Sequence, residues 1–174
     1  GYVSQNTTQM EELASHGYVV ASIAHPYEAL SVTYPDGRRV PFSASHAWKI
    51  LGLFSDQAGL RDLMDESHRI WTEDTIFVMD ELGRLNAGEG AFAGGLDLSR
   101  LGVFGMSFGG ATASEVCLSE SRCRAGINLD GALWGDNLRE DGVVRRPFMV
   151  AYHGAVEGMN DEMYRRVDAP AYRV

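Results

Sequence analysis

The residue with the clearest chemical potential is Ser107, which lies at the centre of the segment Gly105-Met-Ser-Phe-Gly-Gly110. The apolar residues 101–104 predict a strand before it, and residues 107–118 predict a helix after it. A strand, a sharp turn and a helix in this order are typical of a nucleophile elbow, which exposes a serine. A serine hydroxyl is a weak nucleophile, so attack on an ester also needs a base and an anion-stabilising site. The alternatives are an incidental serine in a glycine-rich turn, or a phosphate-binding turn, although the G-x-G-x-x-G pattern and the Walker lysine are missing.

A candidate acid follows the serine along the chain. Residues 124–129 predict a buried strand, and Asp130 comes directly after it, where open α/β sheets bind their ligands. An acid at this place would orient a histidine and stabilise its imidazolium, in the order Ser…Asp…His. The residue is explained equally well as the cap of an Asp-Gly turn. Glu157, after the next predicted strand, is a competing acid, and Asp136 lies nearby in a polar loop.

The histidine that such a site needs is not evident. The chain has five histidines, at His16, His25, His46, His68 and His153. Of these, His153 alone follows Asp130, and it comes at the end of a predicted strand. His16 is expected at a helix C-terminus, and His25 either contacts substrate near the site or ends a strand. We expect His46 and His68 to be surface or partly buried residues, and no histidine has the spacing of a metal site.

The elements around these residues alternate between strands and helices. Strands are expected over residues 18–24, 101–104, 124–129 and 147–152, and helices from Asn6 to Gly17 and over 56–85, 107–118 and 160–166, with a break near Thr72 as an option. A turn at residues 34–37 joins two short strands, and the glycine-rich residues 88–95 form a loop. This order predicts an α/β fold with a mainly parallel sheet flanked by helices. We expect one domain over residues 1–174, with residues 27–54 inserted near the mouth of the site.

Composition narrows the class of protein. The 174 residues are 45% hydrophobic and carry a formal net charge of −9, which is typical of a globular chain. Without a basic cluster, nucleic acid is not an expected partner. No apolar run reaches the roughly 20 residues of a membrane span, so no transmembrane segment is expected. Cys117 and Cys123 have neither metal nor redox spacing, and two buried free thiols are favoured over a disulfide between them.

The elbow and the aspartate together resemble one family. Gly105-Met-Ser-Phe-Gly-Gly-Ala-Thr112 and Gly126-Ile-Asn-Leu-Asp130 are similar to the G-H-S-F-G-G-A-T and G-I-x-L-D strings of the platelet-activating-factor acetylhydrolases, which also lie 23 residues apart from serine to aspartate. Residues 13–20 and 97–101 resemble further segments of that family. Met106 departs from it, since the family has histidine there, and residues 131–136 follow the animal enzymes poorly.

The resemblance implies the α/β-hydrolase fold and a serine esterase that needs no metal or other cofactor. Such enzymes cleave short or oxidised acyl groups from phospholipids. It also implies that the backbone N–H groups of Phe108 and Tyr2 form the oxyanion hole, and that Asp130 is the acid. The family's histidine would lie after Val174, so we expect a fragment that lacks both ends and a complete triad.

Several alternatives remain beside this expectation. The protein could be a broader carboxylesterase, lipase or polyester hydrolase, or a non-catalytic binding protein with a hydrolase fold. A cluster of apolar residues could dock transiently on a lipid interface, although packing under the long helix is favoured; it comprises Trp48, Ile50, Leu51, Leu53 and Phe54. The resemblance slightly favours a secreted or cell-envelope location.

Overall fold

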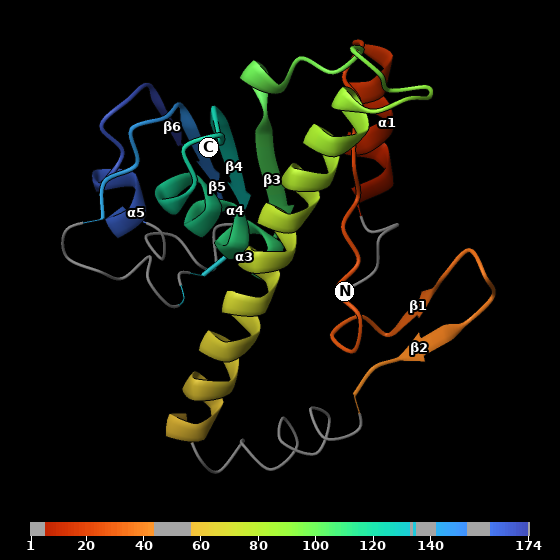
Figure 1. Cartoon of the computed structure of the whole chain (residues 1–174). Coiled ribbons are helices and arrows are strands. Elements are labelled where there is room, and N and C mark those ends of the chain that lie inside the picture. The colour runs from red at the N-terminus through yellow and green to blue at the C-terminus, as the bar shows by residue number, and fades with distance from the viewer. Residues whose placement is uncertain (1–5, 44–56, 133, 135–141, 153–160, 174) are drawn as a thin grey trace. The chain divides into compact units, whose positions relative to one another are not determined.

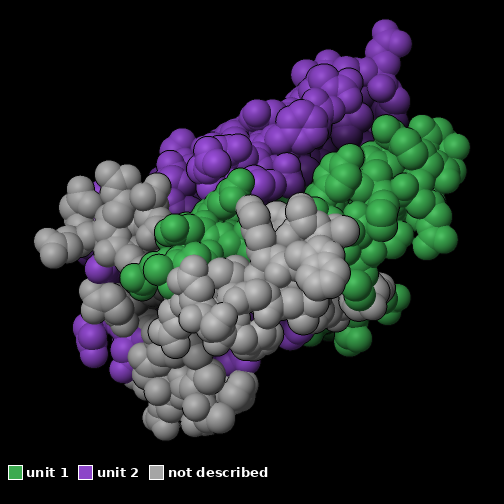
Figure 2. All heavy atoms as spheres, turned by 90° about the horizontal axis from the view of Figure 1, so that it is seen from below, with its two compact units in different colours: residues 1–67 green, residues 68–174 purple. Residues whose placement is uncertain are grey.

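The computed structural model describes residues 6–43, 57–132, 134, 142–152 and 161–173, which fall into two compact units, residues 1–67 and 68–174 (Figures 1 and 2). Each unit is described by itself. In chain order the elements are α1 (Thr7–Ser15), β1 (Ser31–Thr33), β2 (Arg39–Pro41), α3 (Gln57–Ala87), a 3-10 turn η3 (Leu98–Arg100), β3 (Gly102–Met106), α4 (Phe108–Ser119), β4 (Ala125–Leu129), β5 (Phe148–Ala151), α5 (Asp161–Arg165) and β6 (Ala171–Arg173).

The first unit contains the predicted helix and the predicted hairpin. Helix α1 begins after Asn6, whose side chain makes no capping hydrogen bond, and the chain leaves it through Gly17 at φ 88°. Strands β1 and β2 pair in antiparallel fashion, as the turn at residues 34–37 predicted. The Gly37 N–H closes that turn by donating to the Tyr34 carbonyl oxygen at 2.9 Å. Glycine suits Gly37 because its φ of 83° is unfavourable for residues with a side chain.

The strand expected over residues 18–24 is wrong. These residues belong to no helix or strand, and Tyr18 and Val19 are 61% and 57% exposed. A strand requires a neighbour to which its backbone can hydrogen-bond, and none of the described strands pairs with this segment. The apolar run of residues 18–24 therefore indicates a preference for burial but does not identify a strand with which the segment would pair.

Helix α3 is one continuous helix from Gln57 to Ala87, without the optional break near Thr72. The Thr72 hydroxyl donates to the His68 carbonyl oxygen one turn earlier, at 2.9 Å, so this threonine fits inside the helix. The buried residues recur every three or four positions and so form one face. They are Leu63, Ser67, His68, Thr72, Thr75 and Met79. The helix ends at the glycine-rich loop that the sequence predicted.

The second unit is built on a four-stranded parallel sheet in the order β3-β4-β5-β6 (Figure 1). Helix α4 connects β3 to β4 and packs against both strands. The predicted strands at residues 101–104, 124–129 and 147–152 are confirmed, as is a short helix within residues 160–166, whereas β6 was not predicted. The mainly parallel sheet flanked by helices is therefore the expected architecture.

Burial alternates along the strands because one face of the sheet lies under the helices. Gly126 and Asn128 of β4 and Phe148 and Val150 of β5 are buried, whereas residues between them are less so. The core joins residues from α3, α4, β5 and the segments between them; its buried members are Met79, Val116, Cys117, Cys123, Val144, Phe148 and Val150.

The two cysteines form a disulfide, so the favoured expectation of free thiols is wrong. Cys117 near the end of α4 is joined to Cys123 just before β4, with their Cα atoms 5.1 Å apart. Both residues are almost fully buried. A cysteine late in a helix and another just before a strand had seemed poorly placed for pairing. The two come together because the chain turns back directly from α4 into β4.

Candidate functional site

Ser107 lies between the end of β3 and the beginning of α4, in the sharp turn that the sequence predicted. Its backbone has φ 54° and ψ −121°, a conformation that residues with a side chain rarely adopt and that costs about 1–3 kcal/mol. The residue is exposed, and its side chain makes no capping hydrogen bond to α4. The hydroxyl is therefore presented at the positive end of the helix dipole.

Close contact between strand and helix makes this turn possible. A Cβ added at Gly105 would overlap the backbone carbonyl group of Gly109. A Cβ at Gly110 would overlap the Asn128 side-chain oxygen and lie 3.0 Å from the Gly105 carbonyl oxygen. By contrast, a Cβ at Gly109 would meet nothing within 4 Å. Of these three glycines, Gly105 and Gly110 therefore set how closely α4 approaches the sheet.

Asp130 comes directly after β4, beside the serine turn. In the parallel register of β3 and β4, Met106 pairs with Leu129, so Ser107 and Asp130 are the next residues on neighbouring strands. The Asp130 N–H donates to the Ala151 carbonyl oxygen at 2.6 Å, which continues the ladder toward β5. Its φ is 59°, in the left-handed region that aspartate tolerates better than most residues.

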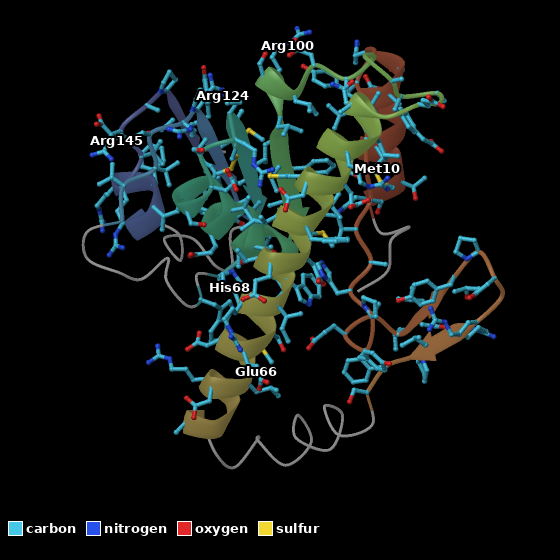
Figure 3. All side chains as sticks on the ribbon, viewed as in Figure 1. Met10, Glu66, His68, Arg100, Arg124 and Arg145 are labelled. Atoms are coloured by element: carbon cyan, nitrogen blue, oxygen red, sulfur yellow. A yellow bond between two sulfur atoms is a disulfide. The ribbon has the colours of Figure 1, made fainter. Side chains whose placement is uncertain are left out.

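Gly131 brings the turn after β4 against the turn after β3. A Cβ on Gly131 would overlap the Ser107 carbonyl oxygen, and it would lie 2.7 Å from the Ala111 backbone nitrogen. This contact explains why glycine follows Asp130, and it places the two turns at one edge of the sheet. The edge is the carboxyl end of the strands, whereas Arg100 and Arg124, labelled in Figure 3, mark the amino ends of β3 and β4.

A buried amide beneath these turns was missed by the sequence analysis. Asn128 is 0% exposed and is hydrogen-bonded to Gly131 and to the Ser114 hydroxyl of α4. The signal in the sequence was an amide within an otherwise apolar strand. Burying an amide is costly unless it is hydrogen-bonded, so a partner nearby could have been expected.

Phe108, the first residue of α4, is held by aromatic rings of α3. Its ring meets the Trp71 ring edge to face, with centroids 4.9 Å apart, and the His68 ring at 5.7 Å. His68 is labelled in Figure 3 and is 1% exposed, so it is a core residue and neither a surface nor a partly buried one. These contacts fix the residue whose backbone N–H the family resemblance assigns to the oxyanion hole.

The other candidate residues lie elsewhere. His16 ends α1 as expected, and its Nε2 atom is 3.1 Å from a Glu12 carboxylate oxygen. His25 is buried in the first unit and begins a turn, since its carbonyl oxygen accepts from the N–H groups of Glu28 and Ala29. The remaining candidates lie outside the described residues: Tyr2, His46, the apolar cluster of residues 48–54, Asp136, His153 and Glu157.

Two further observations concern only the described part of the chain. No three histidine, cysteine, aspartate or glutamate side chains within it are grouped so that they could hold a metal ion. Its longest helix, α3, carries too many charges to cross a bilayer, and none of the other helices described is long and apolar enough to do so.

Comparison with known proteins gives three informative similarities, although no protein-family model matches the chain. A protein from Arthroderma benhamiae described as a probable 1-alkyl-2-acetylglycerophosphocholine esterase is 27% identical over 142 residues, which cover 75% of this chain and 30% of that protein. A platelet-activating factor acetylhydrolase from Cavia porcellus is 32% identical over 133 residues, which cover 68% and 30% of the two chains.

The third similarity is to a solved structure. The ferulic acid esterase from Streptomyces cinnamoneus matches with a TM-score of 0.71 and 28% sequence identity, over 94% of this chain and 44% of that one. The chain thus spans about a third of the length of the two curated relatives and less than half of the solved structure.

Proposed function

We propose that this chain, a relative of the platelet-activating-factor acetylhydrolases with the α/β-hydrolase fold, carries the nucleophile and the acid of a serine carboxylic-ester hydrolase. The observation that carries the proposal is the pairing of two unusual turns. Ser107 and Asp130 both have positive φ, and they follow neighbouring strands in register. An enzyme of this class needs its nucleophile and its triad acid at the same edge of a rigid sheet.

In this proposal the Ser107 hydroxyl attacks the acyl carbonyl carbon of the ester. A histidine removes the hydroxyl proton and passes it to the leaving alcohol oxygen, which leaves an acyl-enzyme on Ser107. Water then attacks the acyl carbonyl carbon, and the same histidine takes a proton from the water and passes it to the Ser107 oxygen. This step regenerates Ser107 and releases the carboxylic acid product. Following the family resemblance, we place this histidine in sequence beyond Val174, which keeps the order Ser…Asp…His.

The anion that forms on the carbonyl oxygen needs hydrogen-bond donors fixed in advance. The Phe108 N–H is our first donor, because Phe108 begins α4 and its ring is held by Trp71 and His68. The N–H of Tyr2 is our second donor, taken from the family resemblance. The N-terminus of α4 adds a partial positive charge to the same place.

For the substrate we propose phospholipid-like esters with short or oxidised acyl groups. The support comes from the two curated relatives, of which one is named a probable 1-alkyl-2-acetylglycerophosphocholine esterase and the other a platelet-activating factor acetylhydrolase. The oxidised acyl groups are taken from the family resemblance. Met106, beside the serine, is 39% exposed and would give the mouth of the site an apolar side chain where the family has histidine. We further propose that residues 27–54 form an insertion near this mouth.

A second candidate is an esterase for other carboxylic esters, including feruloyl esters. The observation in its favour is that the ferulic acid esterase structure matches 94% of this chain. The two candidates share the same chemistry at Ser107 and differ in the alcohol and acyl groups that they accept. Rates on an acetylated glycerophospholipid, on a long-chain phospholipid and on methyl ferulate would separate them.

The test of the shared chemistry is covalent labelling of the full-length protein with a fluorophosphonate. We expect one label on Ser107, and no label or ester hydrolysis in Ser107→Ala. Asp130→Asn should still fold and should lose about four orders of magnitude in kcat, as expected for removal of a triad acid. A folded full-length protein that does not label at Ser107 would exclude the proposal.

A further inference from the structure

We infer that Asn128 is a positioning residue for Asp130, an inference that rests on the proposed function. The single side-chain amide of Asn128 holds both peptide groups that follow Asp130. Its Oδ1 atom accepts from the Gly131 N–H at 2.8 Å, and its Nδ2 group donates to the Gly131 carbonyl oxygen at 3.1 Å. The turn that carries Asp130 is therefore tied to the strand from which it emerges.

The hydrogen bonds around Asn128 also fix which way its amide points. The Ser114 hydroxyl donates its proton to the Gly110 carbonyl oxygen at 3.0 Å. A hydroxyl has only one proton, so the Ser114 oxygen can only accept a hydrogen bond from Asn128. The donor must be the Nδ2 group, which lies 3.0 Å from the Ser114 oxygen. Oδ1 then faces the Gly131 N–H. In this orientation the Oδ1 atom accepts one hydrogen bond and the Nδ2 group donates two.

The choice of asparagine is not explained by folding alone. Position 128 is 0% exposed, it lies within β4 and it faces α4, where an apolar residue would be the ordinary choice. A buried amide gains little over an apolar side chain of similar shape, even when every hydrogen bond is made. The neighbouring glycines are also fitted to it, because a Cβ at either Gly110 or Gly131 would run into Oδ1.

What the amide maintains is the conformation of Asp130. A φ of 59° is unfavourable for aspartate, so the surroundings must hold it. The Asp130 N–H is held by Ala151 on one side, and Asn128 holds the peptide groups on the other. Without the amide, the peptide groups on both sides of Gly131 lose these two hydrogen bonds, and the aspartate can relax away from its orientation. A displacement of about 1 Å in a catalytic group can reduce the rate about 100-fold.

The test compares three variants of the full-length protein. Asn128→Ala removes all three hydrogen bonds. Asn128→Leu also removes them but fills the volume, which keeps the core packed and separates positioning from stability. The matched control is Ser114→Ala, which removes the far partner of the amide and leaves both bonds to Gly131. Wild type and Asp130→Asn are measured beside them.

The measurements are kcat and KM for p-nitrophenyl acetate, the pH dependence of kcat/KM, and the melting temperature. We expect Asn128→Ala and Asn128→Leu to lower kcat about 100-fold with little change in KM, while Ser114→Ala keeps the wild-type kcat. The acid limb of the kcat/KM profile reports the base histidine, whose pKa a well-placed carboxylate raises. That limb should therefore move to lower pH in both Asn128 variants and stay in place in Ser114→Ala.

Failure of this inference can be told apart from failure of the proposed function. If wild type labels at Ser107 and Asp130→Asn is inactive, but folded Asn128→Leu matches Ser114→Ala in kcat and pH profile, Asn128 is only structural and the inference is wrong. If wild type does not label at Ser107, the proposed function is wrong and the inference is overturned with it. If Asn128→Ala does not fold, the kcat and pH profile of Asn128→Leu test the inference.

Discussion

The backbone N–H of Ser107 donates to the carbonyl oxygen of Leu129 at 2.8 Å, so the ladder between β3 and β4 continues into the serine turn. The residue after one strand is thereby fixed to the last residue of the next. Because Asp130 directly follows Leu129, the separation of the serine and aspartate turns is set by a sheet hydrogen bond. Side chains on a sheet edge of this kind are placed more accurately than side chains on long loops.

Replacing Gly105 by alanine should damage this edge. The added methyl group would overlap the Gly109 carbonyl group, which is backbone and cannot rotate away. We expect Gly105→Ala to lower the free energy of unfolding of the full-length protein by about 1–3 kcal/mol, and to slow fluorophosphonate labelling of Ser107. Urea denaturation and labelling kinetics would measure both effects.

Gly109→Ala is the matched control for stability. A methyl group there meets nothing within 4 Å, and alanine is favoured over glycine inside a helix by about 0.5–1 kcal/mol. We therefore expect Gly109→Ala to be as stable as wild type or more so. Equal stabilities of the two variants would contradict the close strand–helix contact.

Local patterns in the sequence predicted most of the fold. The elements around Ser107 were found because an apolar strand, small helix residues and a short connection all indicate one β-α-β unit. The failure at residues 18–24 has the opposite cause. Hydrophobicity gives a preference for burial, but a strand also depends on a partner that local sequence does not specify.

The site was predicted less completely, and the difference lies in how far each residue's role depends on distant neighbours. Ser107 and Asp130 stand at recognisable ends of strands. Asn128 gains its role only when α4 folds back and brings Ser114 and the Gly131 turn to it. His68 was placed too near the surface because its burial depends on the ring of Phe108, a residue distant in the sequence.

The Cys117–Cys123 disulfide should stabilise the connection between α4 and β4. It closes a short loop of sequence separation 6, for which restriction of the unfolded chain contributes about 2 kcal/mol. We expect a thiol reductant to lower the urea midpoint of the full-length protein, and a Cys117→Ala/Cys123→Ala double variant to be less stable and insensitive to reductant at this site. Non-reducing peptide mapping that recovers both cysteines as thiols would contradict the assignment.

The ion pair between Glu120 and Arg122 should make stability depend on pH. Hydrogen bonds from the Arg122 guanidinium and N–H lower the pKa of Glu120 from 4.5 to about 2. Since the carboxylate is favoured in the folded state, the pair stabilises the fold above about pH 4.5, and this contribution is lost as the pH falls toward about 2. Arg122 is 38% exposed and also contacts Asp80 of α3, at 2.6 Å.

Glu120→Gln would measure this effect. We expect the variant to be about 1 kcal/mol less stable than wild type at pH 7, a modest value because solvent screens the pair, and to lose less stability between pH 5 and pH 2.5. Glu81→Gln is the control, since the pKa of Glu81 is also lowered by an arginine, Arg84, but the side chains of that pair are more exposed, at 36% and 68%. Parallel pH profiles for wild type and Glu120→Gln would show that the ion pair does not stabilise the fold.

The edge-to-face pair of Trp71 and Phe108 should couple α3 to the first residue of α4. Ring pairs with centroids 4.9 Å apart and planes at 88° are worth about 1 kcal/mol beyond the area that they bury. A double-mutant cycle of Trp71→Leu and Phe108→Leu in the full-length protein should therefore give a coupling energy of about 1 kcal/mol. The control cycle uses Phe77→Leu with Phe108→Leu and should be additive, because Phe77 is 61% exposed. Additivity in the Trp71 cycle would mean that the Phe108 ring is not anchored by α3.

If the coupling is present, Trp71→Leu should also lower kcat more than it changes KM, because the Phe108 N–H would no longer be held where the oxyanion forms.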